Sequence, residues 1–376
     1  MINRLYIHNF RCLENFELPI QGRSSILLVG KNGAGKTTVG VALEILQSIA
    51  RGTNRVGQIV RRQDIARSRA DVSIRFPDVP IRFEIEVELG KQLYQYEVAF
   101  ELPESFRELR VREERLQVNG IAVYSRELAA VHLNKTGQSK EAVFSIDWHL
   151  VALPIIQQLP EDNPVSTFRQ WLGRTLILRP QPSLITGDSQ GETLFPNPDV
   201  TNIGAWLAGM VGRVPAAYTT IETYLKQVMA DLDDIQNMPF GTDSRSLTIQ
   251  FSNELRRLRV PFADLSDGEK CFIISALVLA ANKTYGPLLC FWDEPDNYLA
   301  PSEVGHFIVA LRQAFQSRGQ FIATSHNTEA IRRFSDENTL VLSRKSHLEP
   351  TMVRSLETIP RNGDVVSSIV RGDLEL

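Results

Sequence analysis

The sequence has few cysteines and no strong excess of either charge. Its three cysteines, Cys12, Cys271 and Cys290, are far apart in apolar stretches and form no Cys-x-x-Cys pair. This usage favours reduced core residues over a disulfide framework or a zinc site. A formal net charge of -3 gives no global attraction to nucleic acid or anionic membrane, so contact with DNA would need a local basic patch.

Long apolar runs, heptads and repeats are also missing. No apolar run approaches the roughly 20 residues that span a bilayer, and no basic flank with an apolar segment opens the chain. We therefore expect a cytoplasmic protein without a transmembrane segment. No heptad run is long enough for a coiled-coil arm, and no internal repeat is visible.

The two ends of the chain carry alternating helix and strand signals. Residues 4–10 and 24–29 are predicted strands, and a helix begins at Thr37. Further along, helices are predicted at 269–281, 302–316 and 328–334, with strands at 288–292, 320–325 and 339–343. This order predicts an α/β fold with a parallel sheet flanked by helices. We assign the first 50 residues to the same sheet.

The middle of the chain has a different pattern. Residues 72–124 alternate apolar and charged side chains with period two, and Asn119-Gly120 predicts a hairpin turn, which together indicate an antiparallel sheet with one solvated face. Residues 150–240 have interrupted helical signals: a proline-rich stretch at 179–199 is predicted as a surface loop, and an amphipathic helix follows around residues 218–228.

The segment GKNGAGKTT, residues 30–38, matches the phosphate-binding pattern G-x-x-x-x-G-K-[ST] between a predicted strand and helix. Its glycines let the backbone curl so that N–H groups and the helix N-terminus face phosphate oxygens. Lys36 would reach the β and γ phosphates of a bound nucleotide, Thr37 would bind Mg²⁺, and Thr38 would bond the α-phosphate. The predicted nucleotide-binding residues are Gly30, Asn32, Gly33, Ala34, Gly35, Lys36, Thr37 and Thr38.

Two acids follow the apolar strand at 288–292. Asp293 can hold Mg²⁺ through a water, and Glu294 can polarise the attacking water. The segment ATSHN, residues 323–327, ends the next strand and brings His326 to the same edge, near a γ-phosphate. Solvated turn acids and a packing histidine are the alternatives, which the upstream P-loop disfavours.

Taken together, NGAGKTT, LSDGEK, CFWDEPDNYLAP and TSH resemble the ABC-type ATPase head, in the branch that contains RecF, the SMC proteins and the OLD-like ATPases. The opening LYIHNFRCLENFEL is similar to the start of that branch. The resemblance implies one P-loop NTPase domain over 1–376, with a nucleotide-binding core at 1–70 and 245–345. The remainder would be an antiparallel β subdomain at 71–150, a helical insertion at 151–244 and a tail at 346–376.

The family resemblance also implies a role for LSDGEK, residues 265–270. In such heads this signature turn faces the nucleotide held by a second copy, so Ser266 and Gly268 would meet the γ-phosphate across a homodimer. Ser266 and Glu269 can equally form a local capping box, and the two roles are compatible. Asp296 resembles the D-loop that crosses the same interface.

Several residues fit the family less clearly. Arg11 resembles its basic residue near the phosphates, although a solvated strand-end arginine fits almost as well. Gln58 and Gln63 are both candidates for the Q-loop glutamine, and Ala300 stands where many OLD-like relatives have histidine. The acidic run at 231–234 is more typical of a solvated helix end than of a metal site.

The resemblance leaves three functional hypotheses. The favoured one is a Mg-ATP-dependent ATPase that dimerises and controls a separately encoded effector in antiphage defence or DNA maintenance. An OLD-like nuclease would need a second acidic metal cluster, which we do not find after residue 334. A membrane-transporter motor shares the motifs, but the start of the chain and the antiparallel segment argue against it.

Overall fold

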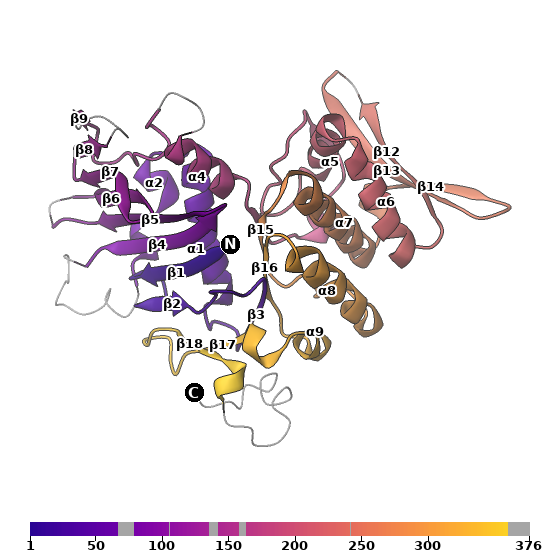
Figure 1. Ribbon diagram of the computed structural model, residues 1–376. Coiled ribbons are helices and arrows are strands. Elements are labelled where there is room, and N and C mark those ends of the chain that lie inside the picture. The colour runs from indigo at the N-terminus through magenta and orange to yellow at the C-terminus, as the bar shows by residue number, and fades with distance from the viewer. Residues whose placement is uncertain (67–78, 105, 135–141, 158–162, 241, 360–376) are drawn as a thin grey trace. The chain divides into compact units, whose positions relative to one another are not determined.

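The computed structural model describes residues 1–66, 79–104, 106–134, 142–157, 163–240 and 242–359 (Figure 1). The chain forms two compact units. Unit 1 comprises Met1–Arg23, Leu28–Thr175 and Asp336–Leu376, and unit 2 comprises Ser24–Leu27 and Leu176–Ser335. The boundary falls within strand β3 (Ser25–Val29), and each unit is described separately.

Unit 1 is built on an eight-stranded sheet in the order β2-β1-β4-β5-β6-β7-β8-β9. Along β4, Ile81, Phe83 and Ile85 are buried while the intervening charged residues are partly exposed, which confirms the predicted period of two. Asn119 and Gly120 turn the β6–β7 hairpin with positive φ angles. The strands are β1 (Ile2–His8), β2 (Phe16–Leu18), β4 (Ile81–Leu89), β5 (Gln92–Glu101), β6 (Arg110–Val118), β7 (Ile121–Glu127), β8 (Ala130–Leu133) and β9 (Ala142–Ser145).

Strand β1 corrects the assignment of the first 50 residues to the parallel sheet. It pairs antiparallel with β2 and β4, with Leu5 opposite Ile85. The reason is visible in its burial: Leu5 and Ile7 are buried while Tyr6 and His8 are partly exposed. Such a pattern suits an antiparallel sheet with one solvated face, whereas the strand that precedes the P-loop, β3, is buried at every position.

The remaining elements of unit 1 include α1 (Lys36–Ala50), α2 (Val56–Ile59) and α4 (Pro164–Gly173). Helix α4 starts at the N-cap Asn163 and packs Phe168 against Tyr94 and Tyr96 of β5. The hairpin of β17 (Thr339–Ser343) and β18 (Met352–Ser355) completes the elements near the P-loop. The predicted helix at Thr37 and strand at 339–343 are confirmed.

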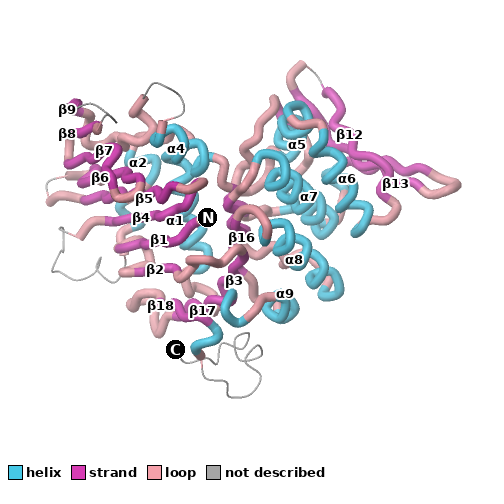
Figure 2. Tube along the Cα trace, viewed as in Figure 1, coloured by secondary structure: helices cyan, strands magenta, loops and turns pink. Residues whose placement is uncertain are grey.

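Unit 2 contains parallel strands β10 (Leu176–Leu178), β15 (Leu289–Trp292) and β16 (Gln320–Thr324), with β15 between the other two. Its helices are α5 (Ile203–Arg213), α6 (Ala216–Val228), α7 (Asp267–Tyr285), α8 (Pro301–Gln316) and α9 (Thr328–Arg333) (Figure 2). Helix α8 packs against α7 and β16. The predicted helices and strands of residues 269–334 are confirmed, with small shifts at their ends.

A second, antiparallel sheet in unit 2 joins β11 (Ser189–Gln190), β13 (Ser244–Ser252), β12 (Leu232–Phe240) and β14 (Arg257–Pro261). Most of the acidic run at 231–234 therefore lies in a strand, not at a helix end, and Asp234 accepts a hydrogen bond from the Tyr218 hydroxyl. The interval predicted as a helical insertion, 151–244, includes β10, β11 and all of β12, so its helices are only part of it.

The stretch at 179–199 is not simply a surface loop. It contains β11 and a short 3-10 turn at Pro182–Leu184, and its Pro182, Ile185 and Gly187 are buried. The Lys270 ammonium donates a hydrogen bond of 3.0 Å to the Pro182 carbonyl oxygen. This stretch supplies the acceptor that a buried lysine on α7 requires.

Candidate functional site

The P-loop joins β3 to α1 through glycines that no other residue could replace without strain. Gly30, Gly33 and Gly35 have φ angles of 147°, 80° and 101°. A Cβ at Gly30 would collide with the carbonyl oxygen of Leu342, and one at Gly35 would lie 2.9 Å from Thr351 Oγ1. The left-handed turns and the close neighbours together require glycine at the two outer positions.

The N-terminus of α1 has no side-chain cap. Its N-cap residue is Gly35, which has no side chain to form a cap, and its first turn contains no acidic residue. By contrast, α4 and α7 are capped by Asn163 and Ser266. Because the first N–H groups of a helix have no partner within it and carry its positive dipole, this end is suited to bind an anion.

Lys36 lies across the same loop. Its side chain is buried, and its ammonium donates hydrogen bonds of 2.8 Å to the Gly30 carbonyl oxygen and 3.3 Å to that of Lys31. The loop oxygens thus hold the charge inside the turn, where phosphate oxygens could become alternative acceptors. The residues of this cradle fit a nucleotide phosphate chain.

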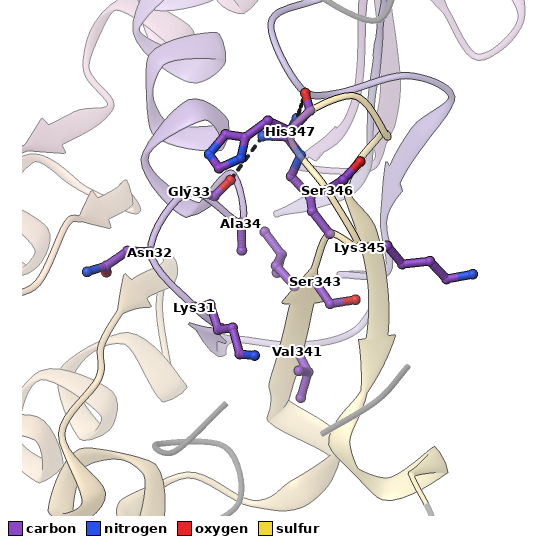
Figure 3. A pocket seen from close by; sticks show the side chains of 12 residues that line it. Lys31, Asn32, Gly33, Ala34, Val341, Ser343, Lys345, Ser346 and His347 are labelled. Carbon is purple, nitrogen blue, oxygen red and sulfur yellow. Dashed lines mark hydrogen bonds between the residues drawn. The ribbon is translucent and has the colours of Figure 1, made fainter. Parts of the chain in front are cut away.

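A cavity of about 300 Å³ lies beside the P-loop, lined by residues 30–34 and 341–347 (Figure 3). The Arg344 guanidinium spans it by donating to the carbonyl oxygens of Gly33 (3.2 Å), His347 (2.7 Å) and Glu349 (2.9 Å). Thr351 donates from Oγ1 to the Ala34 carbonyl oxygen at 3.0 Å. Through Arg344 and Thr351, the β17–β18 hairpin therefore holds the P-loop in shape. No sequence motif predicts this role of the two residues.

The acids and the histidine meet at the ends of β15 and β16 in unit 2. His326 Nε2 lies 3.5 Å from Glu294 Oε1, and both side chains are about one-third exposed (38% and 34%). Thr324 Oγ1 donates to Asp293 Oδ1 at 2.6 Å and accepts from the Glu294 N–H at 2.9 Å. The structure brings Asp293, Glu294 and His326 to one edge, as the sequence predicts, while their chemical roles stay predictions. Thr324 joins them through a contact between two strands, which the TSH motif does not predict.

Asp296, the expected D-loop residue, is held within unit 2. Its side chain is only 2% exposed, and its Oδ2 accepts a 2.8 Å hydrogen bond from the Ser325 hydroxyl within the same unit. Burial is the main cause that raises the pKa of this carboxyl to about 6. The Asp296 side chain thus points into its own unit. The expected place of Asp296 at an interface with a second copy stays a prediction.

The signature turn shows its local role clearly. The Ser266 hydroxyl accepts from the Glu269 N–H at 3.3 Å, and the Glu269 carboxylate accepts from the Ser266 N–H at 2.8 Å. This is the predicted capping box at the start of α7. Ser266 is exposed, and a Cβ at Gly268 would lie 3.1 Å from the Tyr298 carbonyl oxygen. The role of Ser266 and Gly268 toward a second copy stays a prediction.

Three further candidate residues, Arg11, Gln58 and Gln63, also belong to unit 1. Arg11 has a φ of 54°, and its guanidinium forms a 2.9 Å ion pair with Asp64, so it is not a simple solvated arginine. Gln58 and Gln63 are both exposed. Lys36 and Thr37 thus lie in unit 1, whereas Asp293, Glu294, His326 and the signature turn lie in unit 2.

Comparison with known proteins identifies the family. The model of the RecF/RecN/SMC N-terminal domain matches residues 1–348, and the chain belongs to this family. A solved SMC head bound to the C-winged-helix domain of ScpA has a TM-score of 0.52 at 13% identity, covering 95% of this chain and 98% of that one. The SMC head domain of Thermotoga maritima has a TM-score of 0.47 at 14% identity, covering 94% and 98%.

The family and the fold agree. The chain has the α/β fold of an SMC head, an ABC-type P-loop ATPase head with sheets flanked by helices. The family is one of ATPases. A curated relative, the OLD nuclease of Thermus scotoductus, is 48% identical over 46 residues, which are 12% of this chain and 8% of the relative. No helix of the described ranges has both the length and the apolarity to cross a membrane.

Proposed function

We propose that this chain binds and hydrolyses Mg-ATP. The observation that carries the proposal is the P-loop, with its left-handed glycines, its inward Lys36 and an α1 N-terminus that no side chain caps. An uncapped helix end and a buried ammonium in one turn form a preorganised site for phosphate. Family membership over residues 1–348 supports the same activity.

The chemistry would be divided among a few side chains. Lys36, the loop N–H groups and the Thr38 hydroxyl would bind the phosphates, while Thr37 and Asp293 would hold Mg²⁺, which supplies charge neutralisation when bound. Glu294 would accept a proton from the attacking water, and His326, 3.5 Å from Glu294, would contact the γ-phosphate. Asn32 and Ala34 would border the nucleotide, and Arg11 would lie near its phosphates.

We further propose that two copies enclose the nucleotides, with Ser266 and Gly268 of each facing the ATP of the other. An exposed signature turn with an ordered helix N-terminus supports this arrangement. Opening and closing of such a homodimer would control a separately encoded effector in antiphage defence or DNA maintenance. Any DNA would be bound through a local basic patch.

A second candidate function follows from the short match to an OLD nuclease. The described residues contain no group of three or more His, Cys, Asp or Glu side chains placed to hold a metal ion. Incubation of the purified chain with plasmid DNA and Mg²⁺ or Mn²⁺ decides between the candidates. Cleavage that disappears on mutation of acids in this chain would support the nuclease and contradict the ATPase-only proposal.

The ATPase proposal is tested with two variants that fail for different reasons. Lys36→Ala should lose ATP binding and hydrolysis, whereas Glu294→Gln should retain tight binding and lose hydrolysis, because glutamine keeps the shape but cannot accept the proton. Lys91→Ala, which removes an exposed lysine from the β4–β5 turn, is the matched control. Wild-type turnover by Glu294→Gln would refute the assignment of the general base.

A further inference from the structure

We infer that Thr324 is a positioning residue whose single hydroxyl fixes both acids at the end of β15, Asp293 and Glu294. The inference rests on the proposed function of Asp293 and Glu294. Thr324 is the last residue of β16, and its side chain is completely buried. It reaches the loop after the neighbouring strand β15, which pairs with β16 in parallel register.

The contacts of the hydroxyl are divided between the two acids. Oγ1 donates its proton to Asp293 Oδ1 at 2.6 Å, the short distance expected for a hydroxyl bonded to a carboxylate. The same oxygen accepts the backbone N–H of Glu294 at 2.9 Å. The hydroxyl therefore donates to the carboxylate of Asp293 and accepts from the backbone N–H of the next residue, Glu294, so that it holds both groups in place.

The backbone conformation of Glu294 explains why its N–H needs a hydrogen-bond partner. Its φ angle is 51°, in the left-handed region that side chains other than glycine rarely adopt. A residue in this conformation persists only where its surroundings hold it. The bond from the Glu294 N–H to Thr324 holds this peptide. The carboxylate that it carries accepts from the Asn297 side-chain amide through Oε2 and faces His326 through Oε1.

The bond to Asp293 has a separate consequence. The Asp293 N–H already donates to the Leu178 carbonyl oxygen at 2.8 Å, so its backbone is held by β10. Thr324 fixes the orientation of its carboxylate by bonding one oxygen. Because an ordered carboxylate binds a cation more readily than a mobile one, Thr324 should also set the Mg²⁺ requirement.

A purely structural role for Thr324 makes a different prediction. In that case the methyl group would matter as much as the hydroxyl, and substitution would lower stability without a selective effect on turnover. Thr324→Val replaces the hydroxyl with a methyl group at nearly the same size, and Thr324→Ser keeps the hydroxyl and removes the methyl. Thr284→Val, which loses a 2.7 Å hydroxyl bond to the Ala280 carbonyl oxygen on α7, is the matched control.

We expect Thr324→Val to lower kcat by about 100-fold with KM changed by less than about threefold, since misplacement affects the transition state more than ATP binding. Its half-saturating Mg²⁺ concentration should rise. Thr324→Ser should stay within about threefold of wild type, as should Thr284→Val. A Ser variant as impaired as Val, or a Val variant with wild-type kcat and Mg²⁺ requirement, would overturn the inference.

The proposed function fails separately from this inference. If the wild-type chain lacks Mg-ATPase activity, or if Lys36→Ala matches wild type, the proposed function is wrong. If wild-type activity depends on Lys36 and Glu294 while Thr324→Val is unimpaired, only the role of Thr324 is wrong. Should the Val variant fail to fold, Thr324→Ser still decides, because loss of its activity in a folded protein contradicts a role for the hydroxyl.

Discussion

The hydroxyl of Ser325 donates a 2.8 Å hydrogen bond to Asp296 Oδ2, and this carboxylate is almost completely buried. Its other oxygen has no hydrogen-bond partner among the residues that the structure describes. Burial is the main reason that the pKa of Asp296 rises from 3.8 to about 6, and the nearby Glu294 charge adds to it. The acid is therefore held at a cost in stability whenever it is ionised.

This relationship predicts a pH-dependent effect of Asp296→Asn. Since the folded state binds the proton more tightly than the unfolded state, the contribution of Asp296 to stability is fully present below its unfolded pKa and is lost as pH rises through about 6. The loss amounts to about 3 kcal/mol at most. Asparagine keeps an acceptor for Ser325 and cannot ionise. The free energy of unfolding of Asp296→Asn should therefore rise relative to that of the wild type as pH increases.

Urea unfolding at about pH 5 and about pH 8 measures this difference. Ser325→Ala, which removes the bonded hydroxyl and leaves the acid in place, serves as the comparison. An unfolding free-energy difference between Asp296→Asn and wild type that is the same at both pH values would contradict the raised pKa.

A second prediction concerns Arg344, which bonds the Gly33 carbonyl oxygen from the β17–β18 hairpin. Arg344→Ala should weaken ATP binding by about tenfold, because the P-loop loses one of the bonds that keep its shape. Arg344→Lys should recover only part of the loss, since an ammonium cannot replace a guanidinium that donates to three carbonyl oxygens. ATP titrations measure the affinity.

The control for this experiment is Arg354→Ala, which removes an exposed arginine from β18 of the same hairpin. It should leave affinity within about twofold of wild type, because a surface charge contributes little. Equal losses in the two alanine variants would point to general electrostatics and against a specific bond to the P-loop.

The sequence allowed the local parts of this site to be predicted. The P-loop, the acid pair and the capping box are each contained in a few consecutive residues, so their spacing alone reveals them. Arg344 and Gly33 are 311 residues apart, and Thr324 meets Glu294 only because β15 and β16 pair in register. Such contacts depend on tertiary packing, which periodicity does not report.

The correction of strand β1 has an equally physical origin. Its position before β3 in the chain suggests the parallel sheet, whereas its one-sided burial pattern fits the antiparallel sheet. The burial of the Asp296 side chain is equally invisible in the sequence, because Asp296 lies only two residues after the partly exposed Glu294.

A third prediction concerns Glu114, which lies fully buried in the unit 1 sheet. Its carboxylate accepts hydrogen bonds from the hydroxyls of Tyr96 (3.0 Å) and Tyr124 (2.8 Å). It also accepts from the N–H groups of Ala152 (2.7 Å) and Leu153 (2.8 Å), and it faces Arg126 at 3.8 Å. The network anchors residues 152–153 to the sheet.

Glu114→Ala should lower the stability of unit 1 by about 3–5 kcal/mol, because it leaves four donors without their acceptor and the buried Arg126 without its opposite charge. Glu113→Ala, at the neighbouring position, breaks a partly exposed ion pair with Arg82 and should cost less than about 1 kcal/mol. Chemical denaturation followed by circular dichroism compares the two. Similar costs for both variants would show that the buried network contributes no more than a surface pair.

The last prediction separates the local role of Ser266 from its proposed role toward a second copy. Ser266→Arg and Lys36→Ala should each be inactive alone, because in each homodimer both composite sites carry a defect. When the two variants are mixed and exchange subunits, one site of each heterodimer combines an intact P-loop from the first with an intact signature from the second. ATPase activity should then reappear.

Glu269→Ala provides the control, since it removes the carboxylate that completes the capping box while Ser266 remains. It should cost about 1 kcal/mol of stability and keep most of the activity if Ser266 acts on a second copy. If Ser266 only caps α7, Ser266→Arg and Glu269→Ala should behave alike and mixing should restore nothing.

A dimer that closes only with two intact sites would stay inactive after mixing, so the molecular size of the protein in solution provides a second test. Glu294→Gln should dimerise with ATP, and adding Ser266→Arg should abolish that dimer. A size independent of ATP in both proteins would contradict the composite site.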